Sequence, residues 1–223
     1  MSSTLTTLYE DAQLLVVDKP TGMLVHRGWG DDDVALVDLV RARTAGRAAH
    51  PVQRLDRGAS GAVVFARDSE SARLLSVAQA NGELDKRYLA LVRGQPPDAA
   101  TIDHAIPNKP DGPRVDSVTV VRRVATVACE PRAVSLVEVA PLTGRLHQIR
   151  RHLKHLGHPL LGDANYGRGD LNREVARRYG LTRLALHAHA FSLVNPVTGA
   201  RVEGVAAVPD DLTSPMREMG LLA

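Results

Sequence analysis

The sequence predicts an α+β fold with one large, largely antiparallel β-sheet. Apolar runs of strand length recur along the whole chain, and only three or four segments between them show helical spacing. Strand and helix patterns do not alternate in the regular way that a doubly wound parallel sheet requires. The chain has 223 residues, of which 44% are hydrophobic, and this length is sufficient to bury one large core. We therefore expect a single domain over residues 1–223.

The N-terminal part of the chain supplies two strands and two helices. The run QLLVVD at 13–18 predicts a buried strand, which the turn signal KPTG ends. Residues 34–44 carry apolar positions at helical spacing. A second strand is predicted at 61–67, and a second helix follows it at 69–80, with Asp68 as a suitable N-cap and Asn-Gly as the stop.

The middle of the chain is predicted to be rich in strands. Residues 86–94 alternate so that Tyr88 shares one face with two small apolar residues. The segment 95–116 contains five prolines and is expected to be a long surface excursion. Two further strands are expected at 117–124 and 133–140.

A basic helix is predicted next. Thr143 is its expected N-cap, and Gly157 with Pro159 supplies its stop. The apolar face consists of Leu146, Ile149, Leu153 and Leu156. The remaining faces carry Arg145, His147, Gln148, Arg150, Arg151, His152, Lys154 and His155. A strand at 183–194 and a terminal helix at 209–222 complete the prediction.

Arginine dominates the basic residues, with 24 arginines against 4 lysines and a formal net charge of +3. Arginine binds phosphate in planar, two-pronged contacts, so the excess fits a nucleic-acid partner. A GC-rich genome would produce the same excess, so composition does not decide between the two. With one Trp, four Tyr and two Phe, phosphate contacts rather than base stacking would dominate such an interface.

The expected compartment is the cytoplasm. No apolar stretch approaches the roughly 20 residues that span a bilayer, and the N-terminal segment lacks the basic and apolar regions of a secretory signal. A single cysteine, Cys129, excludes an internal disulfide framework. We expect no membrane contact, and a monomer is the default expectation.

The stretch QRLDRGASG at 53–61 places a carboxylate where its charge needs a partner. Asp56 lies between Arg54 and Arg57, directly before the apolar run of a strand. Burying a charge costs several kcal/mol unless it is paired. A carboxylate held by a guanidinium has a lowered pKa and stays ionised at neutral pH. Such an aspartate suits a nucleophile or base, although most aspartates in this position only form turns.

Four stretches, in this order, resemble the motifs of RluA-type pseudouridine synthases. The first two matches are LLVVDKPTGMLVHRG at 14–28 and QRLDRGASG. The other two are LDKRYLALVRG at 84–94 and PLTGRLHQIRRHLKHLGHPLLGD at 141–163. The closing strand of the family is similar to residues 184–199. The resemblance implies the family's catalytic fold, in which helices flank a large mixed, mostly antiparallel sheet with a central active-site cleft.

The resemblance also implies a role for each matched residue. Asp56 matches the catalytic aspartate, and Arg145 matches the arginine that ion-pairs with it. Tyr88 matches the tyrosine that packs against the target base, and Ile149 matches an apolar residue of the same pocket. Arg54 matches the arginine that fills the gap left by the flipped nucleotide.

Three further arginines, Arg57, Arg150 and Arg151, are candidates for RNA contact. One residue departs from the family pattern, since Gln53 stands where the motif has histidine. Glutamine forms hydrogen bonds but cannot be cationic. The substitution therefore questions a protonated role at this position, and not the chemistry of Asp56.

The implied reaction isomerises uridine to pseudouridine in RNA. It breaks the N1–C1′ bond, turns the uracil and joins C5 to C1′ without redox change, so we expect no cofactor. Neither GxGxxG nor GxxxxGK[ST] occurs in the chain. A base inside a stem must first be flipped out, which costs a few kcal/mol.

The expected substrate is tRNA. The segments VHRGW at 25–29 and GLTRLALHAHAFSL at 180–193 most resemble the subgroup that modifies a T-stem uridine of tRNA. Other relatives act on rRNA, which stays the alternative. The chain starts directly at the first strand motif, so we expect no N-terminal S4 RNA-binding domain.

Three other interpretations stay open. Gln53 would fit a non-catalytic RNA-binding relative with a decayed site. The clustered histidines would fit a zinc hydrolase, although no cysteine pair or HExxH accompanies them, and we expect no metal. Ser60 with His187 would fit a hydrolase, although GASG lacks the spacing of G-x-S-x-G.

Overall fold

The structure is a computed structural model, and it describes residues 5–27, 34–44, 46, 48–109 and 111–222. The chain divides into two compact units, one comprising 1–86 with 188–207 and the other 87–187 with 208–223. The expectation of a single domain and of a central cleft therefore stays a prediction. Gly28 of the first motif and Trp29 of the segment 25–29 lie outside the described residues.

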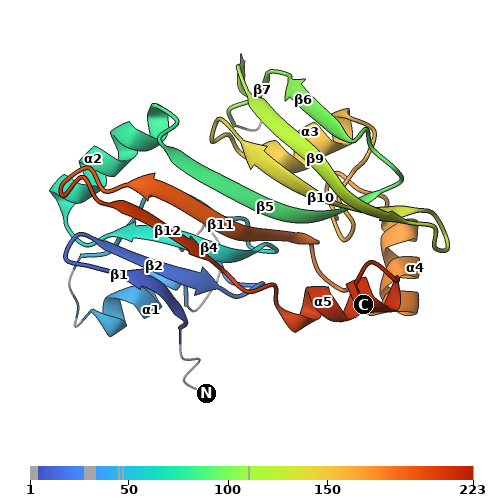
Figure 1. Cartoon of the computed structure of the whole chain (residues 1–223), viewed down its shortest axis with the longest axis horizontal. Coiled ribbons are helices and arrows are strands. Elements are labelled where there is room, and N and C mark those ends of the chain that lie inside the picture. The colour runs from blue at the N-terminus through green and yellow to red at the C-terminus, as the bar shows by residue number, and fades with distance from the viewer. Residues whose placement is uncertain (1–4, 28–33, 45, 47, 110, 223) are drawn as a thin grey trace. The chain divides into compact units, whose positions relative to one another are not determined.

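The first unit combines a sheet with two helices (Figure 1). Its strands are β1 (Thr7–Glu10), β2 (Leu14–Lys19), β3 (His50–Pro51), β4 (Ser60–Ala66), most of β11 (Leu186–Val194) and β12 (Arg201–Val205). Its helices are α1 (Leu36–Arg43) and α2 (Ser69–Ala80), and β5 (Leu84–Arg93) begins here. The order is β1-β2-β4-β11, with β12 beside β11 and β3 beside β4. The pairs β1–β2, β2–β4, β3–β4 and β11–β12 are antiparallel.

Strands β2 and β4 form the centre of this unit. The four residues Leu14–Val17 are fully buried, and every residue of β4 is buried. A strand buried on both faces is a continuous apolar run, and this explains why both strands were readable from sequence. Gly61 in β4 allows a close approach to β11, because a Cβ there would lie 2.3 Å from the carbonyl oxygen of Ala188.

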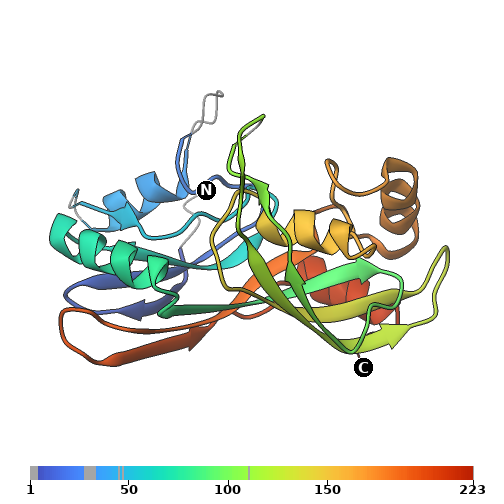
Figure 2. The same cartoon turned by 90° about the horizontal axis from the view of Figure 1, so that it is seen from above.

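The second unit holds the rest of the strands and three helices. They are the remainder of β5, β6 (Ala99–Asp103), β7 (Ile106–Pro107), β8 (Arg114–Val115), β9 (Val118–Val127), β10 (Val134–Pro141), α3 (Gln148–His155), α4 (Gly169–Tyr179) and α5 (Asp210–Glu218). The order is β5-β10-β9-β6, and β7 pairs only with β8. Helix α3 lies against β9 and β10 (Figure 2), and α4 contacts α5. Leu91, Val175 and Met216 belong to the main buried cluster.

The α+β class is confirmed, and the pairings within each unit are antiparallel as expected. The N-cap of α2 is also confirmed, because Asp68 accepts the backbone N–H of Ser71 at 2.8 Å. Within the described ranges, no helix combines the length and apolar character needed to cross a membrane.

The expectation of a surface excursion over 95–116 is wrong in part. Residues 99–103 form β6, which pairs with β9, and Ile102 and Ile106 are buried. Helix α4 was missed altogether, although Leu171, Val175 and Tyr179 recur at four-residue spacing. Only Val175 is fully buried in this helix, so the apolar signal is weak.

A buried ion pair fixes the loop that follows α3. Arg150 donates from Nε and Nη2 to the two carboxylate oxygens of Asp163, each at 2.8 Å. The same carboxylate accepts the backbone N–H groups of Asn165 and Tyr166. Burial raises the pKa of Asp163, but these hydrogen bonds outweigh burial and hold its pKa below the ordinary value. The carboxylate therefore stays ionised and stabilises the fold.

We predict that Asp163→Asn lowers the free energy of unfolding by about 3–5 kcal/mol at pH 7, because it leaves the Arg150 guanidinium buried without its counter-charge. Because the pKa of Asp163 is lower in the folded protein than in the unfolded chain, where it is about 4, the carboxylate stabilises the fold at pH values above about 4. The difference between wild type and variant should thus be constant from about pH 5 to 8 and shrink below about pH 4. Urea unfolding at several pH values measures it.

Asp170→Asn is the matched control, because Asp170 pairs with Arg168 on the surface, where both side chains are about 60% exposed. Exposed pairs contribute about 0–1 kcal/mol. Equal stability of the two variants would contradict the structural role of Asp163.

Candidate functional site

Asp56 lies on the loop between β3 and β4, here named the aspartate loop (residues 52–59). The backbone N–H of Ala59 donates to the carbonyl of Asp56 at 3.0 Å, so Asp56 begins a tight turn. Leu55 is buried, Arg54 and Arg57 are exposed, and Asp56 is half-buried. Leu55 thus points inward and Arg54 outward, although the segment is a loop and not a strand.

A buried lysine braces this loop from a neighbouring turn. Lys19 has no exposed surface, and its Nζ donates to the carbonyls of Pro20 at 2.8 Å, Met23 at 2.8 Å and Arg57 at 3.4 Å. An ammonium has three protons to donate, and a buried one is costly unless they find acceptors. Lys19 therefore connects the turn after β2 to the aspartate loop.

Further hydrogen bonds join the same two segments. In the KPTG turn (residues 19–22), the Thr21 hydroxyl donates to the carbonyl of Gly58 at 2.9 Å. The Gly22 N–H donates to the Arg57 carbonyl at 2.8 Å, and Arg57 Nε donates back to the Gly22 carbonyl at 3.0 Å. The sequence interpretation took KPTG only as a turn. A lysine at the end of a buried strand, β2, was the available signal for its anchoring role.

Gln53 supports the loop from the side of β4. It is buried, and its Nε2 donates to the carbonyl of Ala62 at 3.1 Å. Its buried Oε1 has no hydrogen-bond partner among the described residues. A histidine N–H can donate the same bond, so a scaffold role at this position accommodates either residue.

Tyr88 and Ile149 lie in the second unit. Tyr88 is on β5, where it pairs with Val139 of β10, and it is 7% exposed. Ile149 is in the first turn of α3 and is 6% exposed. Both side chains are thus held by packed elements of regular structure.

Arg145 lies in the turn before α3, and Gln148 organises that turn. Gln148 Oε1 accepts the N–H of Arg145 at 3.0 Å and the hydroxyl of Thr143 at 2.7 Å. Gln148 Nε2 donates to the carbonyl of Val118 at 2.9 Å and to the Thr119 hydroxyl at 3.0 Å. The backbone of Arg145 is therefore fixed to β9, while its side chain is exposed.

The predicted start of this helix is wrong. The N-cap is His147, not Thr143, and α3 begins at Gln148. His147 has φ +53, a left-handed conformation that histidine adopts more readily than most residues. Its Nδ1 lies 3.1 Å from the Tyr166 hydroxyl. This residue separates the turn that carries Arg145 from the helix.

Several polar side chains of α3 lie inside the protein and not at its surface. Gln148, Arg150 and His152 are buried, and Arg150 pairs with Asp163. Arg151 donates to the Tyr166 hydroxyl at 2.8 Å and to the Pro107 carbonyl at 2.9 Å. The guanidinium groups of Arg150 and Arg151 therefore connect α3 to neighbouring segments of the protein through hydrogen bonds.

His152 has a structural place as well. Its ring nitrogens lie 2.8 Å from the Thr119 hydroxyl oxygen and 2.9 Å from the His104 carbonyl oxygen. Burial lowers the pKa of His152, which favours the neutral ring. Across the described residues, no three histidine, cysteine, aspartate or glutamate side chains are grouped as metal ligands.

The predicted site residues thus fall into two groups. The first unit brings together Arg54, Asp56 and Arg57 on one braced loop. The second unit holds Tyr88, Arg145, Ile149, Arg150 and Arg151. The ion pair between Asp56 and Arg145 joins the two groups and stays a prediction. A carboxylate at a rigid, arginine-flanked turn is suited to covalent or base chemistry on a phosphate-bearing substrate.

Residues 13–155 match the family described as RNA pseudouridylate synthase. The chain is 38% identical to tRNA pseudouridine synthase C of Haemophilus ducreyi, and the match covers 86% of each chain. The protein of the same name from Pasteurella multocida is 36% identical, with 92% of each chain covered. That of Yersinia pestis is 37% identical, with 86% of this chain and 82% of the relative covered.

Solved structures show the same relationship. Human RNA Pseudouridylate Synthase Domain Containing 1 is 27% identical with a TM-score of 0.77, covering 95% of this chain and 87% of the human one. Human RNA Pseudouridylate Synthase Domain Containing 4 is 25% identical with a TM-score of 0.76, covering 96% and 93%. With the family match over 13–155, the chain belongs to the RluA-type RNA pseudouridylate synthases, isomerases that convert uridine to pseudouridine in RNA.

Proposed function

We propose that this protein isomerises a uridine of tRNA to pseudouridine. The observation that carries the proposal is the identity of 36–38% to several proteins named tRNA pseudouridine synthase C, over 86–92% of this chain. The T-stem uridine is the expected target, in keeping with the subgroup motifs at 25–29 and 180–193.

In this proposal Asp56 is the catalytic carboxylate and Arg145 is its ion-pair partner. Tyr88 packs against the target base, Ile149 lines the same pocket, and Arg54 fills the gap left by the flipped nucleotide. The bracing of the aspartate loop by Lys19 supports this assignment, because catalysis requires a carboxylate held within a fraction of an ångström. Gln148 gives the backbone of Arg145 the same kind of support.

The arginines divide into two roles. Arg54 and Arg57 are exposed on either side of Asp56, so both are positioned to contact the RNA, although Arg57 also supports the loop through its bond to the Gly22 carbonyl. Arg150 and Arg151 were expected to contact RNA directly, but their hydrogen bonds to Asp163, Tyr166 and the Pro107 carbonyl favour a supporting role.

The proposal includes the other expectations from sequence. The reaction has no redox step, so the enzyme needs no cofactor. We further propose a monomer that works in the cytoplasm as one catalytic domain. The family match supports the single domain, because residues 13–155 run through both compact units.

An rRNA substrate and a non-catalytic RNA-binding role are the alternatives. Gln53 motivates the second, but its buried bond to the Ala62 carbonyl is a scaffold contact that a histidine would also make. This observation favours an intact site.

We predict that Asp56→Asn lowers pseudouridine formation by roughly 10³-fold or more, because the amide is neither a nucleophile nor a base. Tritium release from tRNA labelled at uridine C5 measures turnover, and filter binding measures the affinity for tRNA. Affinity should change by less than about threefold, since the variant leaves the phosphate contacts in place. Asp170→Asn is the matched control, and turnover by Asp56→Asn would refute the assignment.

Deletion of the gene should remove a single pseudouridine from the T stem of tRNA and leave rRNA unchanged, because the proposed substrate is one T-stem uridine and such enzymes select their RNA by its shape. Carbodiimide-dependent stops in primer extension, compared between wild-type and deletion strains, locate the lost site. A lost stop in rRNA would move the substrate to rRNA, and unchanged stops in both RNAs would favour the non-catalytic relative.

Replacement Lys19→Met should reduce both stability and turnover. The buried carbonyls that lose their donor cost about 1–3 kcal/mol each, so the free energy of unfolding should fall by at least about 2 kcal/mol. Turnover should fall more than tenfold in a folded sample, because the aspartate loop loses its brace. Lys109→Met, at an exposed position, controls for the loss of one charge, and identical behaviour of the two variants would exclude the bracing role.

A further inference from the structure

A cavity of about 430 Å³ opens in the first unit, next to the start of the aspartate loop. It is lined by His26, Arg27, Val37, Asp38, Arg41, Ala49, His50 and Pro51. These residues come from the segment after the KPTG turn, from α1 and from β3 with the residue before it. None of them has a role in the reaction as described above.

The walls of the cavity are tied to the aspartate loop. The N–H groups of Leu36 and Val37 donate to the carbonyls of Leu24 at 2.8 Å and Val25 at 3.1 Å, which joins α1 to the segment 24–27. That segment continues from the KPTG turn, whose bonds to Arg57 and Gly58 are described above. Pro51 is the last residue before the aspartate loop. The cavity therefore has a fixed place relative to Asp56.

The lining has an excess positive charge. Arg27 Nε donates to Asp38 Oδ2 at 3.0 Å, so the charges of these two residues cancel each other. The hydrogen bond from the Ala35 N–H, followed by that from Arg27, lowers the pKa of Asp38 and keeps it ionised. The guanidinium of Arg41 forms neither a hydrogen bond nor an ion pair with the part of the chain that the structure describes. Arg41 thus supplies one uncompensated charge.

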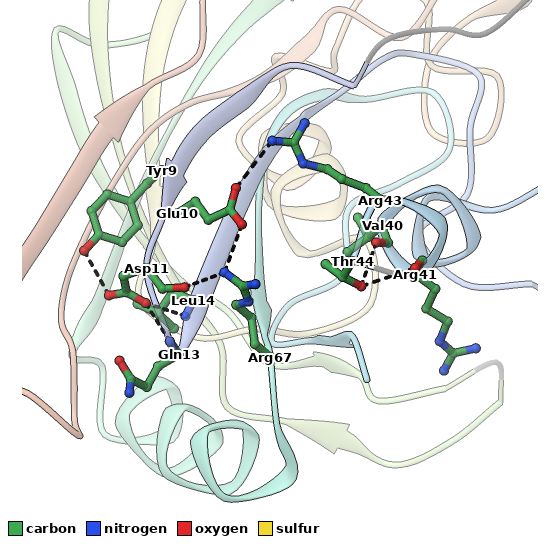
Figure 3. Close-up of polar contacts among 10 residues, drawn as sticks. All are labelled: Tyr9, Glu10, Asp11, Gln13, Leu14, Val40, Arg41, Arg43, Thr44 and Arg67. Carbon is green, nitrogen blue, oxygen red and sulfur yellow. Dashed lines mark hydrogen bonds and ion pairs between the residues drawn. The ribbon is translucent and has the colours of Figure 1, made fainter. Parts of the chain in front are cut away.

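Its neighbour on the same helix differs. Arg43 pairs with Glu10, at 3.4 Å, and Glu10 also pairs with Arg67 at 2.9 Å. Figure 3 shows the side chains of Arg41 and Arg43 leaving α1 in different directions, and of these two guanidinium groups only that of Arg43 has a contact drawn. Arg43 is thus held by a carboxylate that it shares with Arg67, and it is not among the residues that line the cavity.

Two imidazoles add hydrogen-bonding capacity. The Nε2 atom of His50 is buried and has no hydrogen-bond partner among the described residues. A buried polar atom without a partner costs free energy that a bound ligand can recover. Burial, and then the nearby Arg41 and Arg54, lower the pKa of His26. An anion bound beside His26 would raise the pKa of this imidazole.

The size and lining of the cavity indicate which class of ligand would fit it. Ligand sites commonly measure about 300–1,000 Å³, so this cavity exceeds the needs of a lone phosphate group. Arg41 and the imidazoles suit a phosphate, and the apolar Val37, Ala49 and Pro51 suit the adjoining sugar. Arg54, the arginine that is proposed to enter the RNA, follows the lining residue Pro51 by three positions, and its charge contributes to the lowered pKa of His26.

We infer that this cavity binds the phosphodiester and sugar of a nucleotide that flanks the target uridine. The inference rests on the proposed function for the identity of the RNA. Held there, the flanking backbone has a fixed position relative to Asp56 while the target base is turned out of the stem. Arg41 makes the charged contact, and the imidazoles of His26 and His50, which line the same cavity, supply hydrogen bonds.

The matched pair Arg41→Gln and Arg43→Gln tests this inference, because each removes one positive charge from the same helix. Filter binding of an unmodified tRNA transcript is measured at several salt concentrations for the wild type and both variants. Arg41→Gln should weaken binding about fivefold to tenfold and lower the slope of log K against log salt by about 0.7–0.9, the value for one lost phosphate contact. Arg43→Gln should change the affinity less than about twofold, with an unchanged slope.

Equal affinities and slopes for the two variants would overturn the inference. The same transcript and inorganic phosphate are also titrated against the wild type, with the His26 imidazole followed by NMR. A His26 pKa that rises with the transcript supports an RNA phosphate, whereas a response to inorganic phosphate alone would assign the cavity to a free anion and overturn the inference. Tritium release from the same samples tests the proposed function separately. If the wild type shows no turnover, the proposed function is contradicted. If the two variants bind the transcript equally well, the inference about the cavity is contradicted.

Discussion

The ammonium of Lys19 is the interaction on which the candidate site of the first unit depends. It donates to carbonyls in two segments, the KPTG turn with Met23 and the aspartate loop. Because a charged lysine without acceptors is costly in a buried place, the ammonium and the carbonyls hold one another in position. Asp56 is fixed on one side of this interaction, and the segment that leads to the cavity is fixed on the other.

The parts of the fold that could be predicted are those with local signals. β2 and β4 are continuous apolar runs, and α2 has an aspartate cap and an Asn-Gly stop. By contrast, β6 is short and mostly exposed, and it is a strand because β9 pairs with it. Helix α4 is similar, since it buries one residue fully and is held by contact with α5. Partners distant in sequence decide such elements, so a local pattern does not reveal them.

The same distinction applies to the candidate site. The pattern and the resemblance single out Asp56 and Arg145 as candidates, because each lies in a stretch of characteristic residues, and their catalytic roles stay a prediction. The residues that support them were missed, since their partners are remote: Lys19 contacts a carbonyl 38 positions away, and Gln148 contacts one 30 positions away. The sequence leaves a decayed site open as one interpretation of Gln53, whereas its bond to the Ala62 carbonyl makes this residue part of the scaffold. Supporting residues need the folded chain to be recognised.

RNA binding alone does not explain the arginine excess. Arg150 neutralises Asp163 in the interior, and Arg183 pairs with Asp211 while donating to backbone carbonyls. A planar guanidinium with five donors suits such positions, because it bridges a carboxylate and several carbonyls at once. Arg41 and Arg54 differ, since neither forms a hydrogen bond or ion pair with another described residue. The free donors of a guanidinium, and not the number of arginines, therefore indicate where this surface can accept phosphate.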